Sequence, residues 1–159
     1  MRNQLMFQIP KKGLTVWRLY GLFNTLFMAV LAAVASFLTY KFEWLPIIYY
    51  IAVAVVIIVA ITSVWLFPKI RWDHWRYEVR EHEIEIQSGL FVVKRTLIPM
   101  VRVQHVDTVQ GPILKKYDLA NISISTAATT HIIPMLITKE ADDLRGRISI
   151  LARVAEDDV

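Results

Sequence analysis

The stretch "LYGLFNTLFMAVLAAVASFLTY" (residues 19–40) contains no charged residue. A second uncharged stretch, "WLPIIYYIAVAVVIIVAITSVWLFP" (residues 44–68), follows almost at once. An α-helix needs about 20 predominantly apolar residues to cross a hydrocarbon core about 30 Å thick. Both stretches are long enough, and a chain of 159 residues offers too little soluble core to bury two such helices. We therefore predict two membrane-spanning helices, at about residues 19–40 and 46–67.

The connection between these helices is short, so they should form an antiparallel hairpin. The first apolar run is too long for a cleavable signal peptide, whose apolar region spans about 7–15 residues. Basic residues gather outside the hairpin and are rare in its loop, which predicts that both chain termini are cytoplasmic. The chain then divides into a cytoplasmic N-terminal segment (1–18), the membrane hairpin (19–68) and a cytoplasmic domain (69–159). The basic residues that flank the hairpin are Arg2, Lys11, Lys12, Arg18, Lys69, Arg71 and Arg76.

The net charge of +4 comes from the first 68 residues, which hold five basic residues and one acidic residue. Residues 69–159 hold 13 of each and are neutral. The excess therefore belongs to the flanks of the membrane helices, and it does not indicate nucleic-acid binding. The absence of cysteine excludes disulfides and thiolate chemistry.

The cytoplasmic domain shows mainly the period-two pattern of β-strands. Alternating apolar residues predict strands in "HWRYEVR", "EIEIQSG" and "LFVVKRTLIP" (residues 90–99). In "IPMVRVQHVDTVQGPI" (residues 98–113), Val101 and Val103 keep the strand phase, and the apolar spacing then changes to three. This change indicates a bulge or a helical turn.

The remainder of the domain contains two more strands and a helix. "ILKKY" should form one helical turn, and "LANISIS" should form a strand that slips near Asn121. The strand "TTHIIPMLI" contains Pro134, which favours an edge position or a bulge. A helix capped by Thr138 should follow. Its apolar stripe consists of Ala141, Leu144, Ile148, Leu151 and Ala155.

These patterns predict a membrane α-helical hairpin joined to a mainly-β (α+β) domain. About six or seven short antiparallel strands would form a small, partly open barrel or split sheet. The amphipathic C-terminal helix would cover its apolar face.

The run from residue 97 to residue 130 resembles the signature of bacterial pleckstrin-homology-like membrane proteins of the YdbS/YdbT type. Two membrane spans before one such domain match the smaller, YdbS-like members. The resemblance implies a pleckstrin-homology fold and supplies no established biochemical activity. The residues that carry it are Ile98, Pro99, Arg102, Val103, Gln104, Gln110, Gly111, Pro112, Leu119, Ala120, Ser125, Thr126 and Ala127.

Asp118 departs from this signature, which usually has glycine before Leu-Ala. Aspartate tolerates a left-handed backbone better than most residues, so we expect the turn to be retained.

No convincing catalytic or metal site emerges from the sequence. His105 and Asp107 would share one face of a strand, but no nucleophile is evident near them, so we predict a structural role. The other histidines, at positions 74, 82 and 131, lack metal-ligand spacing. "SISTAATT" lacks the motif that activates a catalytic serine. We predict no catalytic residue, metal or cofactor.

Two basic groups stand out, Lys94-Arg95 with Arg102, and Lys115-Lys116. The two pairs Lys94-Arg95 and Lys115-Lys116 are candidate contacts to a lipid or a partner. A cation near the anionic inner leaflet gains about 1 kcal/mol without specific recognition. Asn24, inside the first span, is a candidate contact between membrane helices.

The main hypothesis is a non-enzymatic, membrane-anchored interaction protein of the bacterial cell envelope. Besides the lipid bilayer, its expected partners are other copies of itself or a larger YdbT-like membrane protein. One alternative is a sensor of anionic lipid headgroups that uses the two basic pairs. A second is a membrane-bound lipid hydrolase that uses His105 and Asp107.

Overall fold

The computed structural model describes residues 5–157. These residues form two compact units. One is the helical segment 17–70, and the other combines residues 5–16 with the described residues from Arg71 onward. Two helices are long and apolar enough to cross a membrane, Lys11–Lys41 and Ile47–His74.

The helical unit is an antiparallel hairpin. Helix α1 (Lys11–Lys41) begins eight positions before the predicted span, and a turn around Glu43, whose φ is 53°, leads to the second helix. That helix runs without a break through α2 (Ile47–Ala60), the π-helical segment η1 (Ile61–Leu66) and α3 (Phe67–His74). The helices extend beyond the predicted spans, into residues 11–18 before the first span and past Pro68 to His74 after the second; Pro68 lies in the first turn of α3, directly after the π-helical segment.

The two helices of the hairpin meet closely at Gly21. A Cβ placed on this glycine would overlap the carbonyl oxygen of Ser63 and lie 2.6 Å from its carbonyl carbon. Asn24 Nδ2 also donates a hydrogen bond to Ser63 Oγ at 3.3 Å, so this amide joins the two helices. Ser63 lies within η1, and π-helical turns interrupt the regular α-helical hydrogen bonding.

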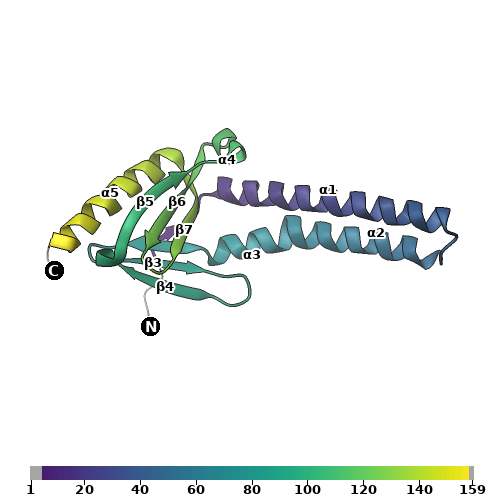
Figure 1. The fold of residues 1–159 in the computed structure, drawn as a ribbon, viewed down its shortest axis with the longest axis horizontal. Helices are drawn as coiled ribbons and strands as arrows, with labels where there is room; N and C mark the ends of the chain where they lie inside the picture. Colours follow the sequence, from purple (N-terminus) through teal and green to yellow (C-terminus); the bar gives the residue numbers. More distant parts are fainter. Residues whose placement is uncertain (1–4, 158–159) are drawn as a thin grey trace. The chain divides into compact units, whose positions relative to one another are not determined.

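The β-rich unit contains two antiparallel sheets (Figure 1). Sheet A has the order β1-β2-β3-β4, and sheet B has the order β5-β6-β7. Among the described residues the strands do not close into one barrel, so the split-sheet form of the prediction is correct. The strands are β1 (Phe7–Gln8), β2 (Arg76–Val79), β3 (Glu83–Ser88), β4 (Lys94–Pro99), β5 (Val103–Val109), β6 (Leu119–Thr126) and β7 (Thr130–Ile137).

Strand β1 was not predicted. It precedes both membrane helices in the chain, yet it pairs with β2, with Phe7 opposite Tyr77 and Gln8 opposite Arg76. Leu5 and Ile9 on either side of it are only 1% exposed. The indole of Trp72 donates to the Ile9 carbonyl at 2.8 Å. The N-terminal segment is therefore an integral part of the β-rich unit, and the hairpin is inserted between its first two strands.

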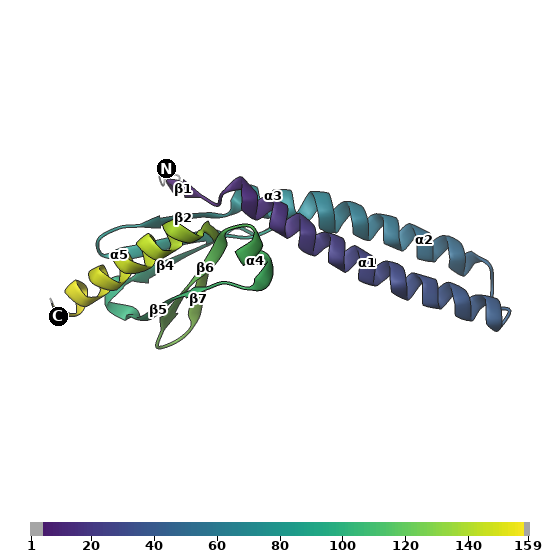
Figure 2. The ribbon, with the colours of Figure 1, turned by 90° about the horizontal axis from the view of Figure 1, so that it is seen from above.

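The C-terminal helix α5 (Thr138–Asp157) lies against the strands of the β-rich unit (Figure 2). It packs on β5, on β6 and on the 3-10 turn η2 (Met100–Arg102). Ala141 and Ile148 from the predicted stripe are fully buried. The core beneath them consists of aliphatic side chains from both sheets, including Ile84, Leu119, Ile122, Ile124 and Ile133.

Three predicted irregularities are confirmed. A bulge shifts the register between Val103 and His105, and a second shift lies at Asn121. There Pro134 and Met135 of the edge strand β7 face the single residue Asn121. Met135 has a φ of 62°, and its N–H donates to Asn121 Oδ1 at 2.9 Å. Asp118 has a φ of 56°, so it adopts the left-handed backbone expected at this turn.

Two strand predictions were wrong in detail. Val101 does not keep the strand phase, because it lies in η2. The third predicted strand, residues 90–99, begins only at Lys94, and residues 89–93 form a loop. A Cβ on Gly89 would overlap the carbonyl oxygen of Val92, so the chain folds back on itself here.

Candidate interaction site

The signature residues separate into a structural group, which is buried or joins elements of the domain, and a surface group. Leu119 and Ala120 are fully buried, and Ile98 is 2% exposed. Gln110 Nε2 donates to the Leu119 carbonyl at 2.8 Å and to Thr138 Oγ1 at 3.0 Å. This amide thereby joins the end of β5 to the starts of β6 and α5. The structural group therefore holds the domain together, through burial of three side chains and through the hydrogen bonds of the exposed Gln110.

Gly111 and Pro112 belong to the same structural group. Gly111 is the N-cap of α4 (Pro112–Lys116), and Pro112 occupies the first turn, where a missing N–H costs nothing. Nothing lies within 4 Å of a Cβ placed on Gly111, so its role is to begin the helix.

The surface group surrounds one shallow pocket of about 370 Å³. Arg102 of η2 and Gln104 of β5 line one part of it, and Thr126 at the end of β6 and Ala127 in the turn that follows line another. Val101 and Ala128 complete the lining, and neither was predicted. The bulge that leaves Gln104 between the pairs Val103–Thr126 and His105–Ser125 lies beside the pocket.

The turn beside the pocket is held by its own hydrogen bonds. Thr126 Oγ1 donates to the Thr129 carbonyl at 2.8 Å, and the Thr129 N–H donates back to this hydroxyl at 3.2 Å. Ala127 and Ala128 are thereby presented to solvent at fixed positions. They form a small apolar wall opposite Arg102.

Arg102 is exposed, and within residues 5–157 no carboxylate lies within ion-pair distance of it. A guanidinium presents five N–H donors in a planar fork that matches a carboxylate or phosphate. The pocket thus offers a cationic donor beside small apolar side chains.

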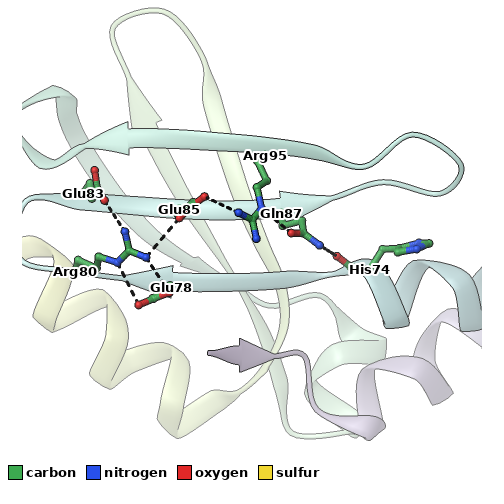
Figure 3. Close-up of polar contacts among 7 residues, drawn as sticks. All are labelled: His74, Glu78, Arg80, Glu83, Glu85, Gln87 and Arg95. Atoms are coloured by element: carbon green, nitrogen blue, oxygen red, sulfur yellow. Dashed lines mark hydrogen bonds and ion pairs between the residues drawn. The ribbon is translucent and has the colours of Figure 1, made fainter. Parts of the chain in front are cut away.

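The four predicted cationic contacts do not form one site. Arg95 Nε donates to Gln87 Oε1 at 2.8 Å, and its Nη1 lies 3.7 Å from Glu85 Oε1 (Figure 3). Lys94 is exposed beside it on β4. Lys115 and Lys116 are exposed on α4, which is well separated from the β3–β4 hairpin in Figure 1.

Glu85 belongs to a wider ion-pair network on the outer face of sheet A (Figure 3). Arg80 contacts Glu83 at 2.7 Å, Glu78 at 3.2 Å and Glu85 at 3.6 Å. The hydrogen bonds that Arg80 donates to Glu78 and then to Glu83 raise the pKa of Arg80. These contacts neutralise most of the charge on this face, so they indicate a structural role.

His105 and Asp107 both lie on β5 with exposed side chains. They are opposite Ser125 and Ser123 of β6, and among the described residues neither is hydrogen-bonded to the other. The part of the chain that the structure describes has no cluster of three metal-ligating side chains.

A groove of about 580 Å³ lies between the β1–β2 pair and α5. Phe7 stacks on Tyr77 at its edge, with ring centroids 5.6 Å apart. Burial, and then the charge of Glu140, raise the pKa of Tyr77 to about 12. The residues that line the groove are Phe7, Gln8, Pro10, Tyr77, Val79, Ile137, Glu140, Asp143, Leu144 and Arg147.

This shift predicts alkaline destabilisation. Tyr77 holds its proton more tightly in the folded state than in the unfolded state, where its pKa is about 10. The resulting stabilisation is complete below pH 10 and is lost as the pH rises from about 10 to about 12. The midpoint temperature of thermal unfolding should fall over this pH range. In the Tyr77→Phe variant the midpoint should fall by less over the same range. Tyr117→Phe is the matched control, and an equal response of both variants would contradict the assignment.

Comparison with known proteins identifies the family of this domain. The sequence pattern of the family described as bacterial PH domain matches residues 16–152. The chain belongs to the bacterial PH domain family. It is 52% identical to the UPF0699 transmembrane protein YdbS of Bacillus subtilis (strain 168), over the full length of both chains. The predicted resemblance is therefore confirmed.

A second relative is much longer. The UPF0699 transmembrane protein YdbT of the same organism is 30% identical over 96 residues, which cover 59% of this chain and 18% of YdbT. No solved structure matches. The membership and the two apolar helices identify a membrane protein that carries a PH domain.

Proposed function

We propose that this protein is a membrane-anchored, non-enzymatic interaction protein whose PH domain assembles with itself or with a larger YdbT-like membrane protein of the cell envelope. The observation that carries the proposal is Arg102, an exposed arginine without a carboxylate partner among the described residues, in a pocket with a small apolar wall. A partner that offers a carboxylate beside a small apolar side chain would fit this pocket.

The place of the pocket in the domain favours a protein partner. The connections to the membrane helices leave sheet A where Gln8 pairs with Arg76. The pocket begins at the other end of the sheet, where Pro99 pairs with Glu83 and the Met100 N–H donates to the His82 carbonyl at 2.9 Å. Within the β-rich unit the pocket is therefore at the end of the sheet away from these two connections, so the connections do not cover it.

The orientation of the chain is part of the proposal. Lysine and arginine flank the hairpin on the side of both termini, which favours a cytoplasmic domain. The exposed and mutually unbonded His105 and Asp107 support a role without catalysis. The dispersal of the four predicted cations supports protein contact over a single headgroup site.

The test is assembly in the membrane. Two differently tagged copies of the chain are expressed together, and separately one copy is expressed with a YdbT-like protein. After gentle extraction, native mass spectrometry should detect a homo-oligomer or a complex in one of the two preparations. A monomer in both preparations would reject the proposal.

A charge reversal locates the contact. Arg102→Glu should reduce recovery of the assembly by about tenfold or more, because a hydrogen bond to a charged group contributes about 1.5–3 kcal/mol. Arg153→Glu changes an exposed cation on α5 and should leave recovery unchanged. Equal recovery with both variants would show that assembly does not use the pocket.

A further inference from the structure

The loop between β3 and β4 presents an apolar tip to solvent. Phe91 is 78% exposed and Val92 is 81% exposed, and Val93 is 45% exposed. Large apolar side chains that protrude together from a loop mark an interaction surface. Neither the ion-pair network nor the Arg102 pocket includes this tip.

The shape of the tip is fixed by the backbone. Gly89 has a φ of 150°, a conformation that residues with a side chain rarely adopt. A Cβ at this position would overlap the Val92 carbonyl oxygen and lie 2.8 Å from its carbonyl carbon. The loop therefore closes tightly and keeps Phe91 and Val92 at its apex.

The strand register shows the direction of the tip. Arg76, the first residue of β2, pairs with Gln8 on one side and with Gln87 on the other. Gln87 Nε2 also donates to the His74 carbonyl at 3.3 Å. The chain thus enters and leaves the two membrane helices at the end of sheet A from which the β3–β4 loop projects.

The charge next to the tip suits a membrane surface. Lys94 follows the apolar residues directly and is exposed, and it pairs with Ser88 at the base of the loop. An apolar apex above a cation matches the order of acyl chains and anionic headgroups in a bilayer leaflet.

We infer that the tip formed by residues 89–93 inserts Phe91 and Val92 into the interface of the bilayer that holds the two helices. The tip is then a third attachment of the domain to the membrane, besides its two helix connections. It restricts the tilt of the domain and keeps the opposite end turned away from the lipid. This role is separate from partner docking through the Arg102 pocket.

The absence of cysteine from the chain makes the test direct. Full-length Val92→Cys is labelled with an environment-sensitive nitrobenzoxadiazole dye and reconstituted into phosphatidylcholine–phosphatidylglycerol vesicles. We expect blue-shifted emission that is quenched by lipids carrying a shallow doxyl group. Ile150→Cys is the matched control, because this α5 residue is apolar and 65% exposed. Its dye should be quenched by aqueous iodide and not by the doxyl lipids.

Two outcomes would overturn the inference. Quenching of the dye at position 92 by iodide alone would place the tip in water. A blue shift without doxyl quenching would show that protein covers the tip. If the tip inserts, Phe91→Ser added to Val92→Cys should weaken the doxyl quenching. The dye readout does not depend on Arg102, so failure here leaves the proposed assembly to be judged on its own test.

Discussion

Replacing Gly21 by leucine should separate the two membrane helices. The position has no room for a side chain, because even a Cβ would overlap the backbone of Ser63. Overpacking a tight contact costs about 3 kcal/mol at the upper end of the usual range, and backbone on the opposing helix cannot rotate away as a side chain can. This cost corresponds to about a hundredfold loss in the population of the packed hairpin.

Disulfide formation between the helices measures this effect in the full chain. The side chains of Asn24 and Ser63 meet across the two helices, with Nδ2 3.3 Å from Oγ, and the chain has no native cysteine. The double variant Asn24→Cys/Ser63→Cys should therefore crosslink readily in membranes. Addition of Gly21→Leu should abolish most of the crosslinking.

A matched glycine substitution provides the control. Gly146 lies in α5, and nothing is within 4 Å of a Cβ placed on it. Gly146→Leu should leave the crosslinking unchanged, because the added side chain meets open space. Equal crosslinking in the Gly21→Leu and parent chains would show that the hairpin is not packed at Gly21.

The features that could be predicted were those with a local signal. The absence of charge over some twenty residues indicates a membrane helix whatever the helix contacts. Pro134 restricts its own backbone, so the bulge in β7 followed from residue type, whereas the left-handed turn at Asp118 followed from the family signature and from the tolerance of aspartate for that conformation. The stripe through Ala141 and Ile148 predicted which face of α5 is buried.

The features that were missed depend on distant parts of the chain. Phe7 and Gln8 form too short a strand to give a pattern, and their partners on β2 follow only after the whole hairpin. In the sequence, nothing distinguishes Gly21 from any other glycine of a membrane helix. Its importance follows only from the fold, which places the backbone of Ser63 against it. The signature predicted Arg102 and Thr126 as important positions, but only the fold brings them into one pocket with Val101.

The loop at residues 89–93 was missed for a different reason. Apolar β-branched residues such as Val92 and Val93 favour strands, so the sequence pattern extended the strand back to Leu90. The conformation of Gly89 overrides that preference. The apolar residues 91–93 were therefore predicted to belong to a strand, although the structure places them in an exposed loop.

Substitution of Ile9 by alanine should strongly destabilise the β-rich unit, although this residue precedes both membrane helices. Ile9 is 1% exposed, and its Cγ2 lies 2.8 Å from the position of a Cβ added to Gly13. Removing a buried isoleucine side chain to the β-carbon costs about 2–5 kcal/mol. That loss is a large part of a domain stability of about 5–15 kcal/mol.

The measurement is the rate of proteolysis of the β-rich unit in detergent-solubilised full-length protein. Ile9→Ala should be cleaved faster than the parent chain at the same protease concentration. Met6→Ala is the matched control, because Met6 is three positions away and 78% exposed, and its loss should change stability by less than about 0.5 kcal/mol. If Ile9→Ala were as resistant as Met6→Ala, the N-terminal segment would not belong to the core. If Ile9→Ala is selectively sensitive, a fragment of residues 69–159 lacks part of its own core, and partner or lipid binding must be studied with the full chain.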